Sequence, residues 1–242
     1  MRINVLPGDS VAEAFAAAGL DGETVVCREC LVDGDISGDT LVEFWDLRAN
    51  FIEVHYGGDP LEYRERVAYE LERLLEAGAD DEVFLWFEYE LFCQANMWFC
   101  LSLLRSTGAK VFRVMPAGLE PDNIWDGFGA MTADDLARCF DERVEFTAAD
   151  IDAACELWQA FRDRDGERLL ELGDYRSSAF PFLKEVCRAA AEIETRPKEI
   201  VNELLANGHT KLEDVFPEFR KRAGVYGFGD LQVERLIHAA SN

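Results

Sequence analysis

The sequence predicts an α/β fold in two parts. Residues 1–122 are expected to form an open, parallel, Rossmann-like sheet with helices on both faces, and residues 123–242 a mainly helical domain. Short apolar runs alternate with helix-length segments in the first part, which is typical of parallel strands joined by right-handed crossovers. The run at 83–87 is apolar at every position, as expected for a central strand covered on both faces. From Thr132 onward the pattern is helical, with no convincing strand before the last thirty residues.

In the first part, each predicted strand is a short apolar or β-branched run next to turn residues, and a helical pattern follows it. The predicted strands are 2–6, 24–29, 82–87 and 110–115, and the predicted helices are 11–18, 41–54, 60–77 and 91–106.

In the second part, Thr132 and Thr147 each stand three residues before an aspartate, and this spacing predicts a capped helix start. Further helices are expected at 179–194, 197–206, 212–222 and 230–238. Short helices followed by the glycine-rich segment 223–229 also fit a winged-helix arrangement. In a chain this acidic, such a unit would bind protein rather than DNA.

The charge balance excludes a nucleic-acid partner. The net charge is −24, from 48 acidic and 24 basic residues, whereas affinity for nucleic acid depends on cationic contacts with phosphate. No apolar run reaches the roughly 20 residues of a membrane span, and the N-terminus shows no signal-peptide profile, so a soluble, cytoplasmic protein without a membrane partner is expected. Only five of the basic residues are lysines, which fits either a high-salt environment or a GC-rich genome.

The seven cysteines are scattered through apolar segments, and their number is odd. Buried, reduced thiols explain this better than a disulfide framework. Cys27 and Cys30 have the spacing of a zinc or redox pair, but the chain has no second pair with matching spacing and only three histidines to complete a site. No metal site is therefore assigned, and the cofactor remains unknown.

Two segments form the candidate ligand site. Gly8, Asp9 and Ser10 follow the first strand, and residues 86–94 follow the third. In an open α/β sheet both lie at the carboxyl ends of strands, where such folds bind ligands. The free N–H groups of a helix that begins after Gly8 are suited to an anion, although Asp9 and Ser10 are also ordinary capping residues.

Arginines near the same strand ends suggest an anionic ligand. Arg28 and Glu29 end the second strand, and Arg48 lies on the following helix. If the strand ends converge, Arg28 and Arg48 are placed to clamp an anionic group. The alternative is ordinary ion pairing of Arg48 with Asp46 or Glu29.

Glu88 directly follows the fully apolar strand, with Gln94 six residues later. A carboxylate in that position is expected to be partly desolvated, with a raised pKa suited to acid–base work. Paired with Asp9 it could instead hold Mg²⁺. The plainer alternative makes Glu88 a helix-start acid and Gln94 a hydrogen-bonding partner in the core.

Ser10 raises a further alternative, a serine hydrolase of the GDSL type. The acid and histidine that such chemistry requires would have to come from Glu234 and His238. Their spacing is one residue longer than the usual Asp-x-x-His, so the pattern fails.

Several of these motifs together resemble an uncharacterised bacterial family, domain of unknown function 1835, with its usual helical companion region. The resemblance spans nearly the whole chain. Its most specific piece is Leu85-Trp-Phe-Glu88 with Phe92-Cys-Gln94, and it departs from the family pattern at Asp35 and at Tyr89-Glu90, which puts a role for Glu90 in doubt. It implies the architecture and the choice of segments, and no activity.

The leading functional hypothesis is that the chain binds a small anionic or phosphate-bearing ligand at the strand ends. The predicted ligand-binding residues are Gly8, Asp9, Ser10, Arg28, Glu29, Arg48, Glu88 and Gln94, with Glu88 and Ser10 as the catalytic candidates. A regulatory module that engages a protein partner through the helical half is the main alternative. Whether the protein is an enzyme is not decided by the sequence.

Overall fold

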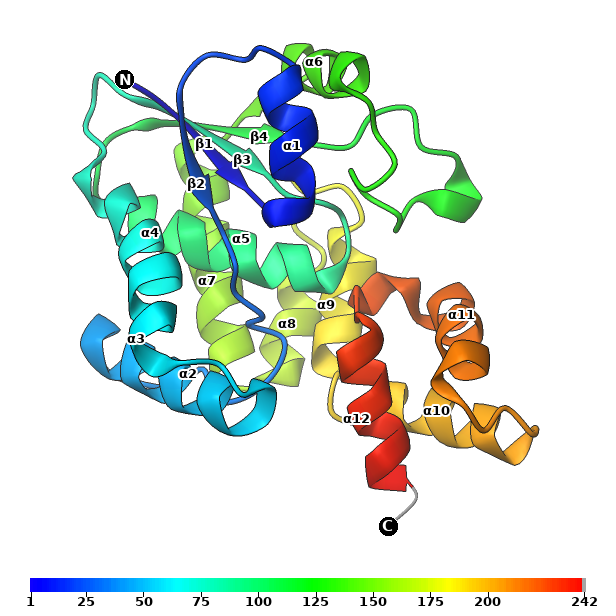
Figure 1. Ribbon diagram of the computed structural model, residues 1–242. Helices are drawn as coiled ribbons and strands as arrows, with labels where there is room; N and C mark the ends of the chain where they lie inside the picture. Colours follow the sequence, from blue (N-terminus) through cyan, green and yellow to red (C-terminus); the bar gives the residue numbers. More distant parts are fainter. Residues whose placement is uncertain (241–242) are drawn as a thin grey trace.

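A computed structural model describes residues 1–240 and shows a five-stranded sheet with helices on both faces (Figure 1). The strand order is β2-β1-β3-β4-β5. The first four strands pair in parallel, and β5 is antiparallel to β4. The predicted α/β class and its four parallel strands are confirmed. The strands are β1 Arg2–Leu6, β2 Glu23–Val26, β3 Glu82–Trp86, β4 Lys110–Val114 and β5 Val144–Glu145.

The alternation of side chains along β3 supplies a core to each face of the sheet. Phe84 and Trp86 belong to the cluster under α1 (Asp9–Ala17) and α6 (Ala133–Asp141). Val83 and Leu85 point the other way, into the larger core that contains most of α5 (Leu91–Leu104). Because successive strand residues face opposite sides of the sheet, a strand that is apolar throughout has to be covered by other elements on both faces.

Two helices run across the second face. These are α5 (Leu91–Leu104) and, packed on it, α7 (Ala148–Arg162). The predicted helix starts at Thr132 and Thr147 are confirmed, since each threonine accepts the N–H of the aspartate three residues on. A third capping box, at Thr40, begins α2 (Leu41–Tyr56).

The predicted helix over 60–77 is present but irregular. It divides into α3 Pro60–Tyr63, the π-helical turn η1 Arg64–Ala68, α4 Tyr69–Glu72 and the 3₁₀ segment η2 Arg73–Glu76. A π turn adds a residue to the helical repeat, and such turns are frequent near functional or tightly packed positions.

The C-terminal third is helical, and its described residues contain no strand that could form a wing. Its last three helices pack on one another. One helix, α8, was not predicted; Asp165 caps it after a short turn. The remaining elements are η3 Pro121–Asn123, α8 Gly166–Leu172, α9 Leu183–Ala191, α10 Arg196–Ala206, α11 Leu212–Ala223, η4 Gly224–Tyr226 and α12 Asp230–Ala240.

The predicted boundary after residue 122 cuts through the sheet layers. Both α6, which packs on α1, and β5, which completes the sheet, lie beyond it. A two-residue strand is too short to show a period in the sequence, and this is why β5 was missed. The last helix, α12, also contacts the first part of the chain, because its Arg235 forms an ion pair with Asp33. No helix among residues 1–240 combines the length and apolar composition needed to cross a membrane.

Candidate functional site

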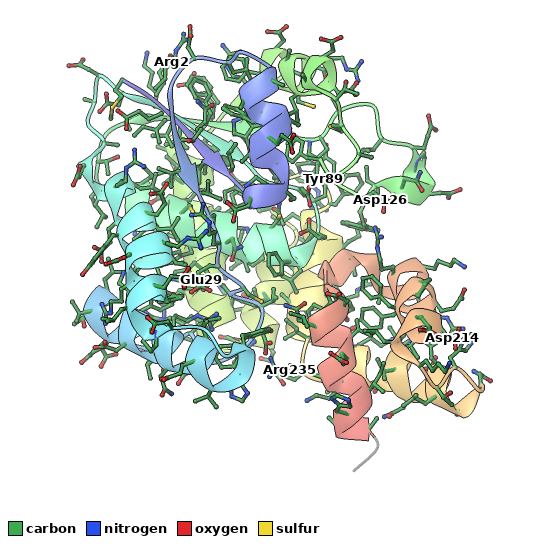
Figure 2. All side chains as sticks on the ribbon, in the orientation of Figure 1. Arg2, Glu29, Tyr89, Asp126, Asp214 and Arg235 are labelled. Atoms are coloured by element: carbon green, nitrogen blue, oxygen red, sulfur yellow. The ribbon has the colours of Figure 1, made fainter. Side chains whose placement is uncertain are left out.

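The structure does not gather the predicted site residues into one place. In Figure 2 the labelled Glu29 lies on the side of α3 and α4, away from Tyr89 and Asp126. Arg48 accompanies Glu29, whereas Arg28 and Asp9 lie at a shallow depression and Glu88 lies at a larger cavity. The single site expected from the sequence is therefore three separate environments.

Arg48 and Glu29 form a fully buried ion pair. Arg48 is 0% exposed, and its Nε and Nη2 donate to the two carboxylate oxygens of Glu29 at 3.2 and 2.8 Å. Its remaining donors bind the backbone carbonyls of Cys30, Asp33 and Asp35. The Tyr63 hydroxyl also donates to Glu29. Arg48 thus holds the 29–35 loop, and no donor is left to clamp a ligand, so the predicted Arg28–Arg48 clamp is corrected to ion pairing with Glu29.

Arg28 and Asp9 bind each other at the start of α1. Arg28 donates from Nε and Nη2 to the Asp9 carboxylate at 2.9 and 2.7 Å, and the hydrogen bond from Arg28 lowers the pKa of Asp9. Gly8 is the N-cap, and among the described residues no side chain caps the first turn of α1, in which the exposed Ser10 lies. Arg66 lines the same depression, with a volume of about 340 Å³.

The geometry offers no support for a serine hydrolase. Ser10 lies in the first turn of α1, and the proposed acid and base lie on α12. In Figure 1 the C-terminal end of α12 is well separated from α1. A base must be within hydrogen-bond reach of the hydroxyl that it activates, and this arrangement does not bring the two together.

A cavity lies where β3 ends, between the sheet and the C-terminal helices. Its volume is about 540 Å³, which is within the usual range for small-molecule sites. In Figure 2 Tyr89 and Asp126 mark the region between the sheet and the orange helices. The lining includes four acids, two basic residues and four aromatic rings: Glu88, Glu90, Asp122, Asp126, Arg220, Lys221, Trp125, Phe216, Phe219 and Phe228.

Glu88 lies at the inner end of this cavity, where the chain leaves β3. The N–H of Phe128 donates to Glu88 Oε1 at 2.6 Å, and the Cys93 thiol lies 3.9 Å from Oε2. Burial raises the pKa of Glu88, more than these contacts lower it. The sequence predicted this direction of the shift, because a carboxylate directly after a doubly covered strand is taken out of water.

Glu90 is the more deeply buried of the two acids, at 4% exposure. Its Oε1 accepts the N–H of Cys93 at 2.9 Å and caps α5, whereas Oε2 has no hydrogen-bond partner among the described residues. Burial, reinforced by the neighbouring Glu88, raises the pKa of Glu90 from 4.5 to about 8. An unpartnered buried carboxylate oxygen is costly, and the raised pKa of Glu90 reflects this cost.

Gln94 and Arg113 hold the backbone of the loop between β3 and α5. Gln94 is buried and donates its side-chain amide to the Glu88 carbonyl, which is the core role considered as the alternative. Arg113 on β4 is fully buried and donates to the same carbonyl at 3.3 Å, while burial lowers its pKa to about 10. Both residues shape the loop from below and do not line the cavity.

Glycines with positive φ press against both carboxylates. Gly127 has a φ of +66°, and a Cβ there would lie 2.0 Å from Glu88 Cδ. Gly227 has a φ of +67°, and a Cβ there would lie 2.3 Å from Glu90 Cγ. Only a residue without a side chain allows the backbone to pass this close at these angles.

We expect Gly127→Ala to lower the free energy of unfolding by about 2–4 kcal/mol, from strain at positive φ together with overpacking against Glu88. Urea unfolding measures this loss. Gly57→Ala is the matched control, because Gly57 has a φ of +69° with nothing within 4 Å of its Cβ position. Its loss should be about 1 kcal/mol. Equal losses in the two variants would contradict the close approach to Glu88.

Sequence reasoning missed Glu90 and the far wall of the cavity. Glu90 was noticed but discounted because it departs from a family pattern. The wall comes from residues 122–126 and 216–229. The sequence predicted a helix over 212–222 and a flexible, glycine-rich segment over 223–229, but assigned neither to a site. The available signal was the pair of acids two residues apart after a doubly covered strand, followed three residues later by Cys93.

Comparisons with protein-family models, with curated proteins and with solved structures find no match to this chain. The resemblance to domain of unknown function 1835 therefore stays a prediction. The site has to be interpreted from its own geometry.

Proposed function

We propose that the protein binds a small molecule in the 540 Å³ cavity at the carboxyl end of β3, and that positive charge or hydrogen-bond donors meet Glu88 and Glu90 there. The observation that carries this proposal is the unpartnered, buried Oε2 of Glu90 beside the half-buried carboxylate of Glu88. An oxygen in this state is stabilised by a donor or a cation, and the cavity provides room for one.

The walls favour a ligand with a planar or apolar body. Trp125 and Phe228 line the cavity together with the carboxylates, and aromatic faces attract both flat rings and cations. At the rim, Arg220 is paired with Asp126 at 2.8 Å and Lys221 with Glu218 at 2.6 Å. With both cations already paired and four acids in the lining, the cavity favours a positive inner group over an anion.

The anionic-ligand hypothesis is a separate proposal at a separate place. It now depends on Arg28 and Arg66 beside the first turn of α1, without Arg48. The two proposals differ in ligand charge and in the residues that a mutation should disable, so one screen distinguishes them.

The test is thermal unfolding of the EDTA-treated protein against two panels. One panel contains primary amines, amidines and nucleosides, and the other contains nucleotides and sugar phosphates. A ligand at a hundred times its Kd adds about 2.7 kcal/mol to the free energy of unfolding, and for a chain of this size this raises Tm by about 5–10 °C. We expect shifts from the first panel that disappear in Glu88→Gln and Glu90→Gln and persist in Arg28→Ala. Shifts only from the second panel, lost in Arg28→Ala, would contradict binding of a positive group at the carboxylates.

A further inference from the structure

The carboxylates at the cavity floor have a third potential ligand beside them. One ligand atom from each of Glu88, Glu90 and Cys93 lies within 4.8 Å of the others. Two carboxylate oxygens and a thiolate sulfur are donors that zinc accepts together. From this cluster we propose that Glu88, Glu90 and Cys93 hold a Zn²⁺ ion that opens onto the cavity.

The backbone already orients the two carboxylates for this role. Glu88 is held through Oε1 by the N–H of Phe128, and Glu90 is held through Oε1 by the N–H of Cys93. Each acid thus uses Oε1 to accept a backbone N–H, and its Oε2 accepts no backbone N–H among the described residues. A hydrogen bond to one oxygen of a carboxylate fixes the direction in which the other oxygen points, and such bonds orient the ligands of metal sites.

The second, independent observation is the state of the free oxygen of Glu90. It is buried in a residue that is 4% exposed, and it has no partner among the described residues. A proton on this oxygen would find no acceptor there, whereas a cation between Glu88, Glu90 and Cys93 would contact it directly. Metal coordination is one of the few ways in which grouped buried acids are stabilised.

The spacing suits zinc with little rearrangement. Bonds of about 2.0–2.3 Å in a tetrahedral site place neighbouring ligand atoms about 3.4–3.7 Å apart. The Cys93 sulfur is already 3.9 Å from Glu88 Oε2, and the widest separation in the cluster is within 4.8 Å. Side-chain adjustments of about 1 Å close the site, and the unpartnered oxygen of Glu90 is free to make one.

Three protein ligands leave a fourth position. Glu88 and Glu90 line the cavity, so that position faces the space in which the proposed ligand binds. An open fourth position is typical of zinc sites that contact substrates, rather than of closed structural sites. This inference rests on the proposed function insofar as both assign a positive group to the same carboxylates; here that group is the metal.

Zinc binding is measured by titration calorimetry on the EDTA-treated, dialysed chain with no organic ligand present. We expect one Zn²⁺ per chain, with affinity reduced by at least about tenfold in each of Glu88→Gln, Glu90→Gln and Cys93→Ala. Co²⁺ provides a second readout: a thiolate-to-cobalt charge-transfer absorption in the wild type that is absent from Cys93→Ala. If Cys93→Ala does not fold, Glu90→Gln and the cobalt absorption of the wild type carry the test.

Cys30→Ala is the matched control, because Cys27 and Cys30 are the cysteine pair with metal-like spacing. It should leave zinc affinity and the cobalt absorption unchanged. No stoichiometric zinc binding, or a loss in Cys30→Ala with none in Glu90→Gln, would overturn the site. If the chain binds no zinc but amines still raise its Tm, the metal site is wrong and the proposed function is retained. If the chain binds zinc but no compound of either panel raises its Tm, the metal site is retained and the proposed function is wrong.

Discussion

Replacing Arg48 with methionine should lower the free energy of unfolding by about 3–5 kcal/mol, because the substitution leaves Glu29 buried without its counter-charge. Both side chains of the pair are 0% exposed, and Arg48 also binds three backbone carbonyls of the 29–35 loop. Urea unfolding at neutral pH measures the loss. The sequence placed Arg48 in a clamp for an anionic ligand, whereas the buried pair predicts that its replacement destabilises the fold.

Two controls separate this loss from a general effect of removing an arginine. Arg66→Met removes a cation whose ion pair with Glu62 is more than half exposed, and it should change stability by less than about 1 kcal/mol. Glu29→Gln combined with Arg48→Met should cost less than the sum of the single substitutions, because no unpaired charge remains. A loss below about 1 kcal/mol for Arg48→Met alone would contradict a structural role for the pair.

The stability of the metal-free protein should fall as pH rises from about 4.5 to about 8, and Glu90 should cause much of the fall. Burial raises the pKa of Glu90 from 4.5 to about 8, so in this range the folded chain binds more protons than the unfolded chain. Stability then decreases with pH. A shift of this size corresponds to at most about 5 kcal/mol, at about 1.4 kcal/mol per pH unit.

Glu90→Gln removes the titrating group, so its unfolding free energy should depend less on pH. Urea unfolding of both proteins at pH 5 and pH 8 in EDTA measures the difference. We expect the decline to be at least about 2 kcal/mol smaller in the variant, since the neighbouring Glu88, whose pKa burial also raises, shares part of the titration. Glu53→Gln, at an exposed position on α2, removes the same charge and should keep the slope of the wild type. Parallel curves for wild type and Glu90→Gln would show that Glu90 does not titrate in this range.

Local pattern predicted much of this fold. The strands β1 and β3, the helix α5 and the capped starts of α6 and α7 are all encoded by residues close together in the chain. Alternation, helical spacing and cap chemistry act over a few residues, which is why they can be recognised without a structure. The desolvation of Glu88 was predictable for the same reason, since the apolar strand that buries it directly precedes it.

The roles of the charged residues were decided by tertiary structure. Arg48 looked like a ligand clamp, but its environment is set by Glu29 and Tyr63, which reach it from other elements. Glu90 became the central residue of the candidate site only because Gly227, 137 positions later, closes against it. The sequence by itself determined the four parallel strands, most of the helices and an acid at the end of a covered strand. Which charges are buried, paired or open to a cavity was decided by the packing of distant segments, because desolvation and hydrogen bonding depend on what surrounds an atom in space.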